Sequence, residues 1–343
     1  MFISWICIIV FLLLLFFPTL SVQGASQGLL LWYQIVVPTL APFMIVTQLV
    51  QAAGGIRMLV KPIYPLLHRC YHTSVNGCYI LLCGLLCGYP VGARLCADFR
   101  RRGQISWPEA CCLLAVCNHP SPMFLLGYVR NQLTAPGVLG PMLAAVYLPI
   151  PLLYYMAVRL YSRQDSIKKS RAKHPSLPIN SHRFPEQPVP DNPHPQNQPV
   201  PDSLQSPDRH CPPLTETDSA EPISFGEMIL STSETLVIIG GTLMLFSVVI
   251  AWIRQLGFLD GRPQALVTGF LEITTGVHQI CQAFSIRQRL LPTLLAVTFG
   301  GCSGILQTYG VIRQAGLSIR HYIGWKFLHT LLSAGLLVLI SVL

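Results

Sequence analysis

Charged residues are scarce in this sequence, and acidic residues are the scarcest. Only 11% of the 343 residues are charged, whereas soluble domains carry roughly 25%. There are 14 Asp and Glu residues against 23 Lys and Arg, and eight of the acidic residues fall between positions 165 and 221. So little charge cannot cover a water-facing surface. With 52% hydrophobic residues, the sequence predicts a protein for which lipid is the main solvent.

The motifs of common enzymes are also missing. The sequence has no Gly-x-Ser-x-Gly elbow, phosphate-binding loop, His-Glu-x-x-His pair or dinucleotide fingerprint. None of the twelve cysteines forms a Cys-x-x-Cys pair, and no Cys/His spacing is typical of zinc. An intramembrane enzyme with Ser303 as its nucleophile is a minor alternative, because no base is evident nearby. We expect no catalytic residue, no metal and no cofactor.

The net charge of +9 does not indicate a nucleic-acid partner. Lys and Arg stand in short clusters between apolar runs, as the positive-inside rule describes for membrane proteins. No basic stripe interleaved with aromatic residues is present. We therefore expect the lipid bilayer, and not a nucleic acid, to be the main partner.

Long apolar runs predict an all-α, polytopic bundle of about eight or nine transmembrane segments. A helix needs about 20 apolar residues to cross the bilayer, and lipid-exposed backbone must be helical. The candidate spans are Phe2–Phe17, Leu29–Val50, Asn76–Ala97, Ala110–Arg130, Gly137–Tyr161, Met228–Trp252, Pro263–Phe284, Leu290–Val311 and Tyr322–Leu343.

A proline-rich stretch divides the chain into two membrane halves, residues 1–162 and 223–343. Residues 163–222 hold thirteen prolines and few large apolar residues, a composition typical of disorder. Basic residues from Arg159 to Lys173 place this loop in the cytoplasm by the positive-inside rule. The sequence thus predicts a multi-pass protein of the cell membrane with a large cytoplasmic loop.

The orientation of one segment stays open. If Asn76–Ala97 crosses the membrane, the basic residues Arg57, Lys61 and Arg69 lie outside the cell. If it is a re-entrant hairpin, they lie inside. The positive-inside rule favours the hairpin, whereas the length of the segment favours a span.

Two glycine pairs resemble each other across the halves. Gly88 and Gly92, which flank Tyr89-Pro90, match Gly300 and Gly304, so the halves are either duplicated or similar by chance. Glycine and proline interrupt helices, and paired interruptions in two halves indicate a transporter's binding site. Close helix packing through small residues is an equally good interpretation.

One carboxylate and several polar residues are candidates for a solute or ion path. Glu272 lies near the middle of a predicted span, where a charge is costly and indicates function. Two prolines break the segment that contains Asn118, and Gln307 follows the second glycine pair. The full candidate set is Gly88, Tyr89, Pro90, Gly92, Asn118, Pro122, Glu272, Gly300, Gly301, Ser303 and Gln307.

Several motifs, taken in order, resemble a known family. They are Val-Pro-Thr-Leu-Ala-Pro-Phe (37–43), Gly-Leu-Leu-Cys-Gly-Tyr-Pro-Val-Gly-Ala-Arg (84–94), Arg-Gly-Gln-Ile-Ser (102–106), Cys-Asn-His-Pro-Ser-Pro-Met-Phe-Leu-Leu-Gly (117–127), Gly-Phe-Leu-Glu-Ile-Thr-Thr-Gly (269–276) and Phe-Gly-Gly-Cys-Ser-Gly-Ile-Leu-Gln (299–307). This pattern is similar to the YlbJ-type family of sporulation integral membrane proteins, and it covers nearly all of the chain outside 163–222.

The resemblance implies a multi-pass membrane protein of endospore-forming bacteria, associated with spore cortex formation. It also implies a nucleoside-recognition "gate" domain, carried here by the motifs in 84–127. Two functions follow as alternatives. The first is a transporter-like protein that moves an unidentified small solute through the broken segments, with Glu272 as the coupling group. The second is a non-transporting assembly factor that works through other sporulation membrane proteins.

Overall fold

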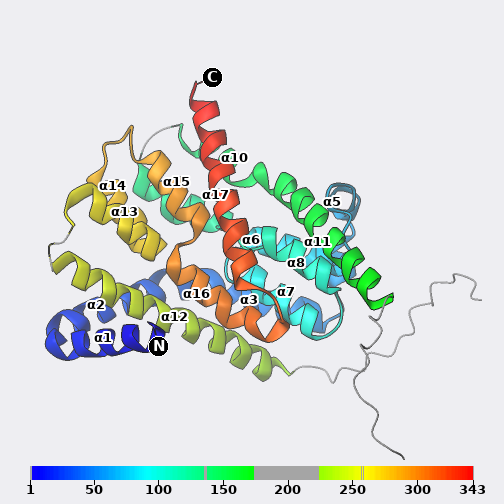
Figure 1. The fold of residues 1–343 in the computed structure, drawn as a ribbon, viewed down its shortest axis with the longest axis horizontal. Coiled ribbons are helices and arrows are strands. Elements are labelled where there is room, and N and C mark those ends of the chain that lie inside the picture. Colours follow the sequence, from blue (N-terminus) through cyan, green and yellow to red (C-terminus); the bar gives the residue numbers. More distant parts are fainter. Residues whose placement is uncertain (1, 135–136, 174–223, 256, 258, 343) are drawn as a thin grey trace, which may run out of the picture.

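The computed structural model describes residues 2–134, 137–173, 224–255, 257 and 259–342, and every regular element in these ranges is a helix (Figure 1). The first half contains α1 (Phe2–Phe16), α2 (Pro18–Leu31), the π-helix η1 (Trp32–Val36), α3 (Val37–Ala52), α4 (Ile56–Val60), α5 (Tyr64–Tyr71), α6 (Val75–Cys87), α7 (Val91–Arg101), α8 (Trp107–Val116), the π-helix η2 (Phe124–Val129), α9 (Arg130–Leu133), α10 (Leu139–Tyr147) and α11 (Pro149–Lys173). The second half contains α12 (Phe225–Gln255), α13 (Gly261–Leu271), α14 (Ile273–Ala283), α15 (Leu290–Phe299), α16 (Gly301–Ile312), the 3₁₀-helix η3 (Arg313–Ala315) and α17 (Ile319–Val342). The predicted all-α class is confirmed.

Fewer helices than expected are long and apolar enough to cross a membrane. Within the described residues there are five, namely Pro18–Ala52, Leu139–Tyr161, Phe225–Gln255, Leu290–Ala315 and Ile319–Val342. A sixth is added if α5 and α6, which are bent by 98°, form one span. The chain is therefore a multi-pass membrane protein, but nine full spans is an overestimate because several apolar segments are split.

The first long span is joined to the second half of the chain. It begins at Pro18, earlier than the predicted Leu29, and runs through α2, η1 and α3. It lies antiparallel to α12, as Figure 1 shows, with glycines where the two backbones touch. A Cβ atom on Gly28 would lie only 2.7 Å from the Cα atom of Met244. The small residue thus permits the close helix approach that is common in membranes.

The segment with the uncertain orientation is a helical hairpin. Helices α6 and α7 meet at Gly88-Tyr89-Pro90 and fold back on each other, because a Cβ on Gly92 would lie 3.1 Å from the Cα of Gly84. Each arm has 13 or fewer residues and is therefore at most about 20 Å long, against about 30 Å for the hydrocarbon core. The hairpin alternative is the one observed.

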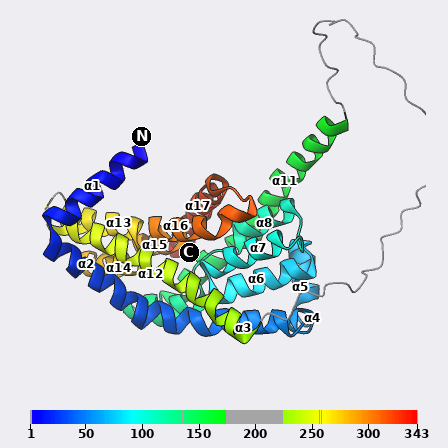
Figure 2. The same ribbon diagram turned by 90° about the horizontal axis from the view of Figure 1, so that it is seen from below.

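A second hairpin replaces the predicted span Pro263–Phe284. Helices α13 and α14 have 11 residues each, and both figures show them side by side (Figures 1 and 2). A Cβ on Gly276 would lie 2.1 Å from the Cα of Gly269. The expectation of one continuous span is wrong here, because hydropathy records an apolar segment but not its continuity. Glu272 lies at the hairpin tip, not within a helix.

Each hairpin is followed by a broken helix. After α8 the chain is irregular over residues 117–121 and resumes as a helix at Pro122. After α15 the chain is interrupted at Gly300, whose φ of +85° ends one helix before α16 begins. The predicted span Ala110–Arg130 therefore consists of two short helical pieces. Leu290–Ala315, in contrast, remains long enough to cross the membrane despite its break.

The two ends of the first half project from the body of the molecule in Figure 2, α1 at one end and the last turns of α11 at the other. Helix α11 continues to Lys173, eleven residues into the range 163–222 that was expected to be a loop. The residues added are good helix formers, and their positive charge suits a helix C-terminus. The rest of the expected loop, 174–222, lies outside the described residues.

Candidate functional site

Each hairpin tip contacts the neighbouring helix break. At the first tip, the Tyr89 backbone N–H donates to the carbonyl oxygen of His119 at 3.0 Å. At the second, a Cβ on Gly301 would lie 3.1 Å from the carbonyl oxygen of Leu271. The two sets also touch each other, since a Cβ on Gly300 would lie 3.8 Å from Cε1 of Tyr89. Four interruptions of helical backbone, from both halves of the chain, are thus gathered in one place.

A cavity of about 300 Å³ lies where these interruptions meet. Helix α3 forms one wall through Thr39 and Phe43, and α12 forms another through Ile239 and Leu243. Tyr128, from the π-helix η2, closes a further side. Residues from seven helices (η1, α3, α6, η2, α12, α14 and α16) therefore surround a space large enough for a small molecule.

The structure brings together just over half of the residues predicted for the site. The predicted residues that line the cavity are Tyr89, Pro90, Glu272, Gly300, Ser303 and Gln307, together with Gly304 from the second glycine pair. The predicted residues that do not line it are Gly88, Gly92, Asn118, Pro122 and Gly301. Tyr89 and Gly300 thus face each other across the contact between hairpin tip and helix break, with Glu272 on the same cavity.

The glycines that miss the cavity pack against backbone. A Cβ on Gly92 would lie 1.8 Å from the carbonyl oxygen of Cys117, and a Cβ on Gly88 would lie 2.7 Å from the Ser121 nitrogen. Real Cβ contacts do not come this close. For these two residues the close-packing interpretation of the glycine pattern is therefore the one that the structure supports.

The two glycine pairs that resemble each other in sequence lie in non-equivalent elements. Gly88 and Gly92 lie in a hairpin, at its tip and in its second arm, whereas Gly300 and Gly304 lie at a break within a long helix. By element order, the first hairpin corresponds to α13 and α14, and the break at 117–121 corresponds to Gly300. Each half thus contains a hairpin, a broken helix and a long helix in the same order, but the register predicted from the glycines is wrong.

Glu272 is buried and caps the helix that follows it. Its side chain is 1% exposed. Its two carboxylate oxygens accept the backbone N–H groups of Thr274 at 2.9 Å and Thr275 at 2.7 Å. A carboxylate at this position satisfies free N–H groups and interacts favourably with the helix dipole. Among the described residues no Lys, Arg or His forms an ion pair with it.

Ser303 and Gln307 lie on one face of α16. The Gln307 amide nitrogen donates to the Ser303 hydroxyl oxygen at 3.1 Å, and both residues are buried. An amide is not a base, so this contact does not activate Ser303 as a nucleophile. In the described part of the chain, no three His, Cys, Asp or Glu side chains are grouped to hold a metal ion.

A buried lysine, which the sequence analysis missed, lies behind the cavity wall. Lys326 of α17 is 2% exposed, and its ammonium donates to the carbonyl oxygen of Asn118 at 3.3 Å. The ammonium also lies 5.5 Å from the centre of the Tyr89 ring, a favourable cation–π arrangement. A Cβ on Gly300 would be 3.8 Å from it. The signal in the sequence was a charged residue within a predicted span.

Asn118 connects the two breaks through side-chain hydrogen bonds. Its amide nitrogen donates to the Thr308 hydroxyl at 2.9 Å and to the Tyr322 hydroxyl at 2.7 Å. Its amide oxygen and the Tyr89 hydroxyl are buried without a hydrogen-bond partner among the described residues. Unsatisfied buried polar groups are uncommon in folded proteins, and here two of them adjoin the cavity wall.

Comparison with known proteins gives one informative match. The chain is 24% identical over 323 residues to the sporulation integral membrane protein YlbJ of Bacillus subtilis, covering 89% of this chain and 74% of that protein. No family model matches the chain, and no solved structure matches it. The similarity extends over most of both sequences, and the relative is an integral membrane protein as this fold requires. The match supports the resemblance to sporulation integral membrane proteins of the YlbJ type, over most of the length of this chain.

Proposed function

We propose that this protein is transporter-like and moves a small solute through the cavity between the two hairpin tips during spore formation. The observation that carries the proposal is the convergence of both tips and both helix breaks on one space of about 300 Å³. Interrupted backbone is tolerated at membrane depth only where protein or a cavity surrounds it. Convergent interruptions from two halves are the usual construction of a solute site in transporters.

The cavity offers the groups that a small polar solute needs. Ser303, in the first turn of α16, lines it, whereas the backbone N–H of Thr274 at the start of α14 already donates to Glu272. Helix starts present N–H groups that can donate to acceptor atoms on a ligand. Phe43, Ile239 and Leu243 supply apolar wall. This combination of an apolar surface with a few directed polar groups is typical of small-molecule sites.

Glu272 is the proposed coupling group, because it is the buried carboxylate of the cavity and has no ionic partner among the described residues. Binding of a proton or cation would neutralise it. A group of this kind can couple occupancy of the cavity to a change in its own charge.

Glu272→Gln tests this proposal. The amide keeps one oxygen that can accept from the backbone of α14, so the helix cap is largely retained while the charge is lost. In the native host with its own gene deleted, we expect the variant to reach normal membrane levels but to give at least tenfold fewer heat-resistant spores. Glu234→Gln, on the exposed face of α12, is the matched control and should behave as wild type. Wild-type spore numbers with Glu272→Gln would refute the coupling role.

We place the cavity's function at the cell membrane, with the loop 163–222 on the cytoplasmic side and spore cortex formation as the process served. The basic clusters around Arg100 and Arg159 support this orientation by the positive-inside rule. The test is a tag inserted at residue 190, which should be accessible to protease only after the membrane is opened. Protection of the tag by an intact membrane would place the loop on the cytoplasmic side. Digestion of the tag from outside an intact membrane would show the opposite orientation.

A further inference from the structure

A second, small polar crevice lies between α3, α7 and α12. Its volume is about 50 Å³, and its walls include Met44, Gln48, Arg94 and Ser231. Two of these helices also line the main cavity, through Phe43 on α3 and Ile239 on α12, and so does Pro90, which directly precedes α7. The two spaces therefore adjoin, and a movement of the side chains between them would join them into one passage.

The sequence positions show in which direction the passage runs. On α3, Phe43 lines the cavity and Met44 lines the crevice. At the start of α7, Pro90 lines the cavity and Val91 lines the crevice. On α12, which runs antiparallel to α3, it passes backwards from Ile239 to Ser231, a distance of about 12 Å along the helix. All three steps lead towards the C-terminal end of α7 and the N-terminal end of α12.

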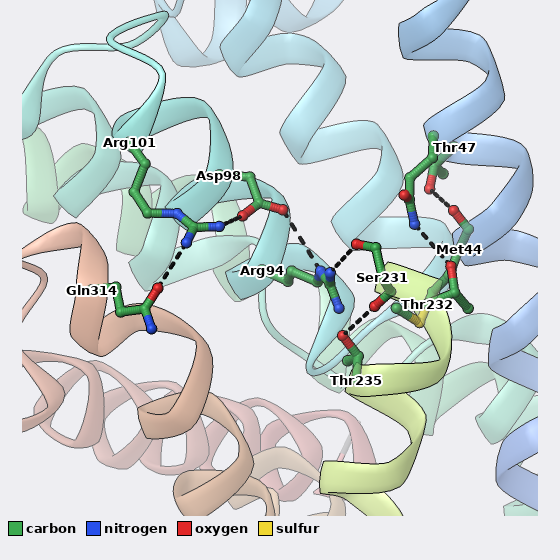
Figure 3. Close-up of polar contacts among 10 residues, drawn as sticks. Met44, Thr47, Arg94, Asp98, Arg101, Ser231, Thr232, Thr235 and Gln314 are labelled. Atoms are coloured by element: carbon green, nitrogen blue, oxygen red, sulfur yellow. Dashed lines mark hydrogen bonds and ion pairs between the residues drawn. The ribbon is translucent and has the colours of Figure 1, made fainter. Parts of the chain in front are cut away.

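Arg94 joins the first hairpin to α12 across this crevice (Figure 3). Its guanidinium donates to the Ser231 hydroxyl at 2.6 Å and pairs with Asp98 at 3.6 Å. Beside it, the Gln48 amide of α3 donates to the Thr232 hydroxyl of α12 at 2.8 Å. Polar bonds therefore connect all three walls across the crevice at one level.

A second contact ties the same part of α7 to the C-terminal half. Arg101 pairs with Asp98 and donates to the side-chain oxygen of Gln314 in η3 at 2.8 Å. Asp98 thus lies between two arginines, and both arginines reach elements that follow the loop in sequence. The carboxylate orients Arg94 towards Ser231 and Arg101 towards Gln314.

These contacts are of a kind that can separate. The side chains of Arg94 and Asp98 are 16% and 21% exposed, so water can replace the bonds they make at small net cost. The hairpin itself is different, because Cys78, Tyr79 and Ile80 of α6 are fully buried in an apolar cluster. The polar contacts between α7 and α12 are therefore the ones that break most easily when these helices separate.

We propose that the crevice is the closed cytoplasmic half of the solute path and that Arg94 is the residue that closes it. That this path carries a solute rests on the proposed transport function. Opening of the cavity towards the end of α7 does not, because it can be measured without any transported molecule. The side is assigned by the four arginines between Arg94 and Arg102, which the positive-inside rule places in the cytoplasm.

The test is a cysteine accessibility measurement on the full-length protein in membranes. Thr39→Cys places a thiol on the half-buried cavity wall of α3. A small, membrane-impermeant methanethiosulfonate ammonium reagent is applied to inverted and to right-side-out vesicles, and labelling at residue 39 is followed by peptide mass spectrometry. The variants compared are Thr39→Cys alone, with Arg94→Ala, and with Arg100→Ala. Arg100 is on the same helix but does not line the crevice.

Arg94→Ala should increase the labelling rate at residue 39 at least tenfold in inverted vesicles, and Arg100→Ala should leave it unchanged. An unchanged rate with Arg94→Ala, or an increase only in right-side-out vesicles, overturns the proposal. Cys78, which is fully buried, must stay unlabelled as the sign of an intact fold. If Arg94→Ala exposes Cys78, then Asp98→Asn is scored by the same criteria, since it weakens the closure with almost no change of volume. Failure of Glu272→Gln to impair spores would refute the coupling role of that residue without affecting this result.

Discussion

At the scale of single residues, two charges define the site, and both are buried without an ionic partner in the described chain. Glu272 caps α14, and Lys326 reaches a backbone carbonyl freed by the break at Asn118. The sequence predicted the first because it stood mid-way along an apolar segment. It did not predict the second, because Lys326 stands only one turn inside the expected span that starts at Tyr322. A lysine near a helix end usually extends to the membrane interface, and this one turns inwards.

We predict that Lys326→Met separates function from stability. An unpaired buried cation costs free energy, so an apolar side chain of similar length should leave the melting temperature in detergent unchanged or raised. Spore formation should nevertheless fall at least tenfold, because the charge behind Tyr89 and Gly300 is lost. The exposed Lys61 provides the control Lys61→Met. A fall in melting temperature that parallels the loss of spores would instead indicate a purely structural lysine.

At the scale of elements, hydropathy located the apolar segments but could not show which of them fold back. Gly88-Tyr89-Pro90 correctly predicted an interruption, and the structure alone decided between span and hairpin. For α13 and α14 the break was missed, because Glu272 was treated as a residue inside a helix. A usable signal was present in Gly269 and Gly276, which flank the carboxylate and lie in contact across the hairpin. A contact between residues in the two arms of a hairpin depends on how the arms pack, which a single sequence does not reveal.

The hairpin packing gives a stability prediction. Gly92→Ala would place a methyl group 1.8 Å from the Cys117 carbonyl oxygen, so α7 must move away from the helix break. Overpacking of this kind costs about 1–3 kcal/mol, and we expect a clearly lower melting temperature of the detergent-solubilised protein. Gly140→Ala in α10, where a Cβ meets open space, should be neutral or slightly stabilising. Equal melting temperatures for the two variants would contradict the observed approach of α7 to residue 117.

At the scale of the whole molecule, composition was sufficient to predict a multi-pass α-helical protein, and the family resemblance was confirmed by a relative that matches most of the chain. The arrangement of the halves was beyond the sequence. The long antiparallel contact of α2 with α12, and the meeting of Tyr89 with Gly300, join residues about 200 positions apart. Only the folded chain shows that both hairpins point to one cavity.

Replacing the proline-rich sequence distinguishes the transport function from the assembly-factor alternative. Replacing residues 175–222 by a Gly/Ser sequence of equal length keeps the reach of the connection but removes every side chain that a partner could recognise. If the cavity carries the function, heat-resistant spore numbers should stay within about twofold of wild type. A severe loss of spores at normal membrane levels would favour the assembly-factor alternative, in which this segment binds other sporulation proteins.

If the cavity between the hairpin tips passes a small solute, the purified protein in liposomes should take that solute up. Proteoliposomes containing the wild type, Glu272→Gln or no protein would be incubated with a small-molecule extract of sporulating cells, and the retained compounds measured by mass spectrometry. At least one compound should accumulate with the wild type and fall to the protein-free level with Glu272→Gln. A wild-type profile that equals the protein-free profile for all compounds, from a preparation that melts cooperatively, would contradict it.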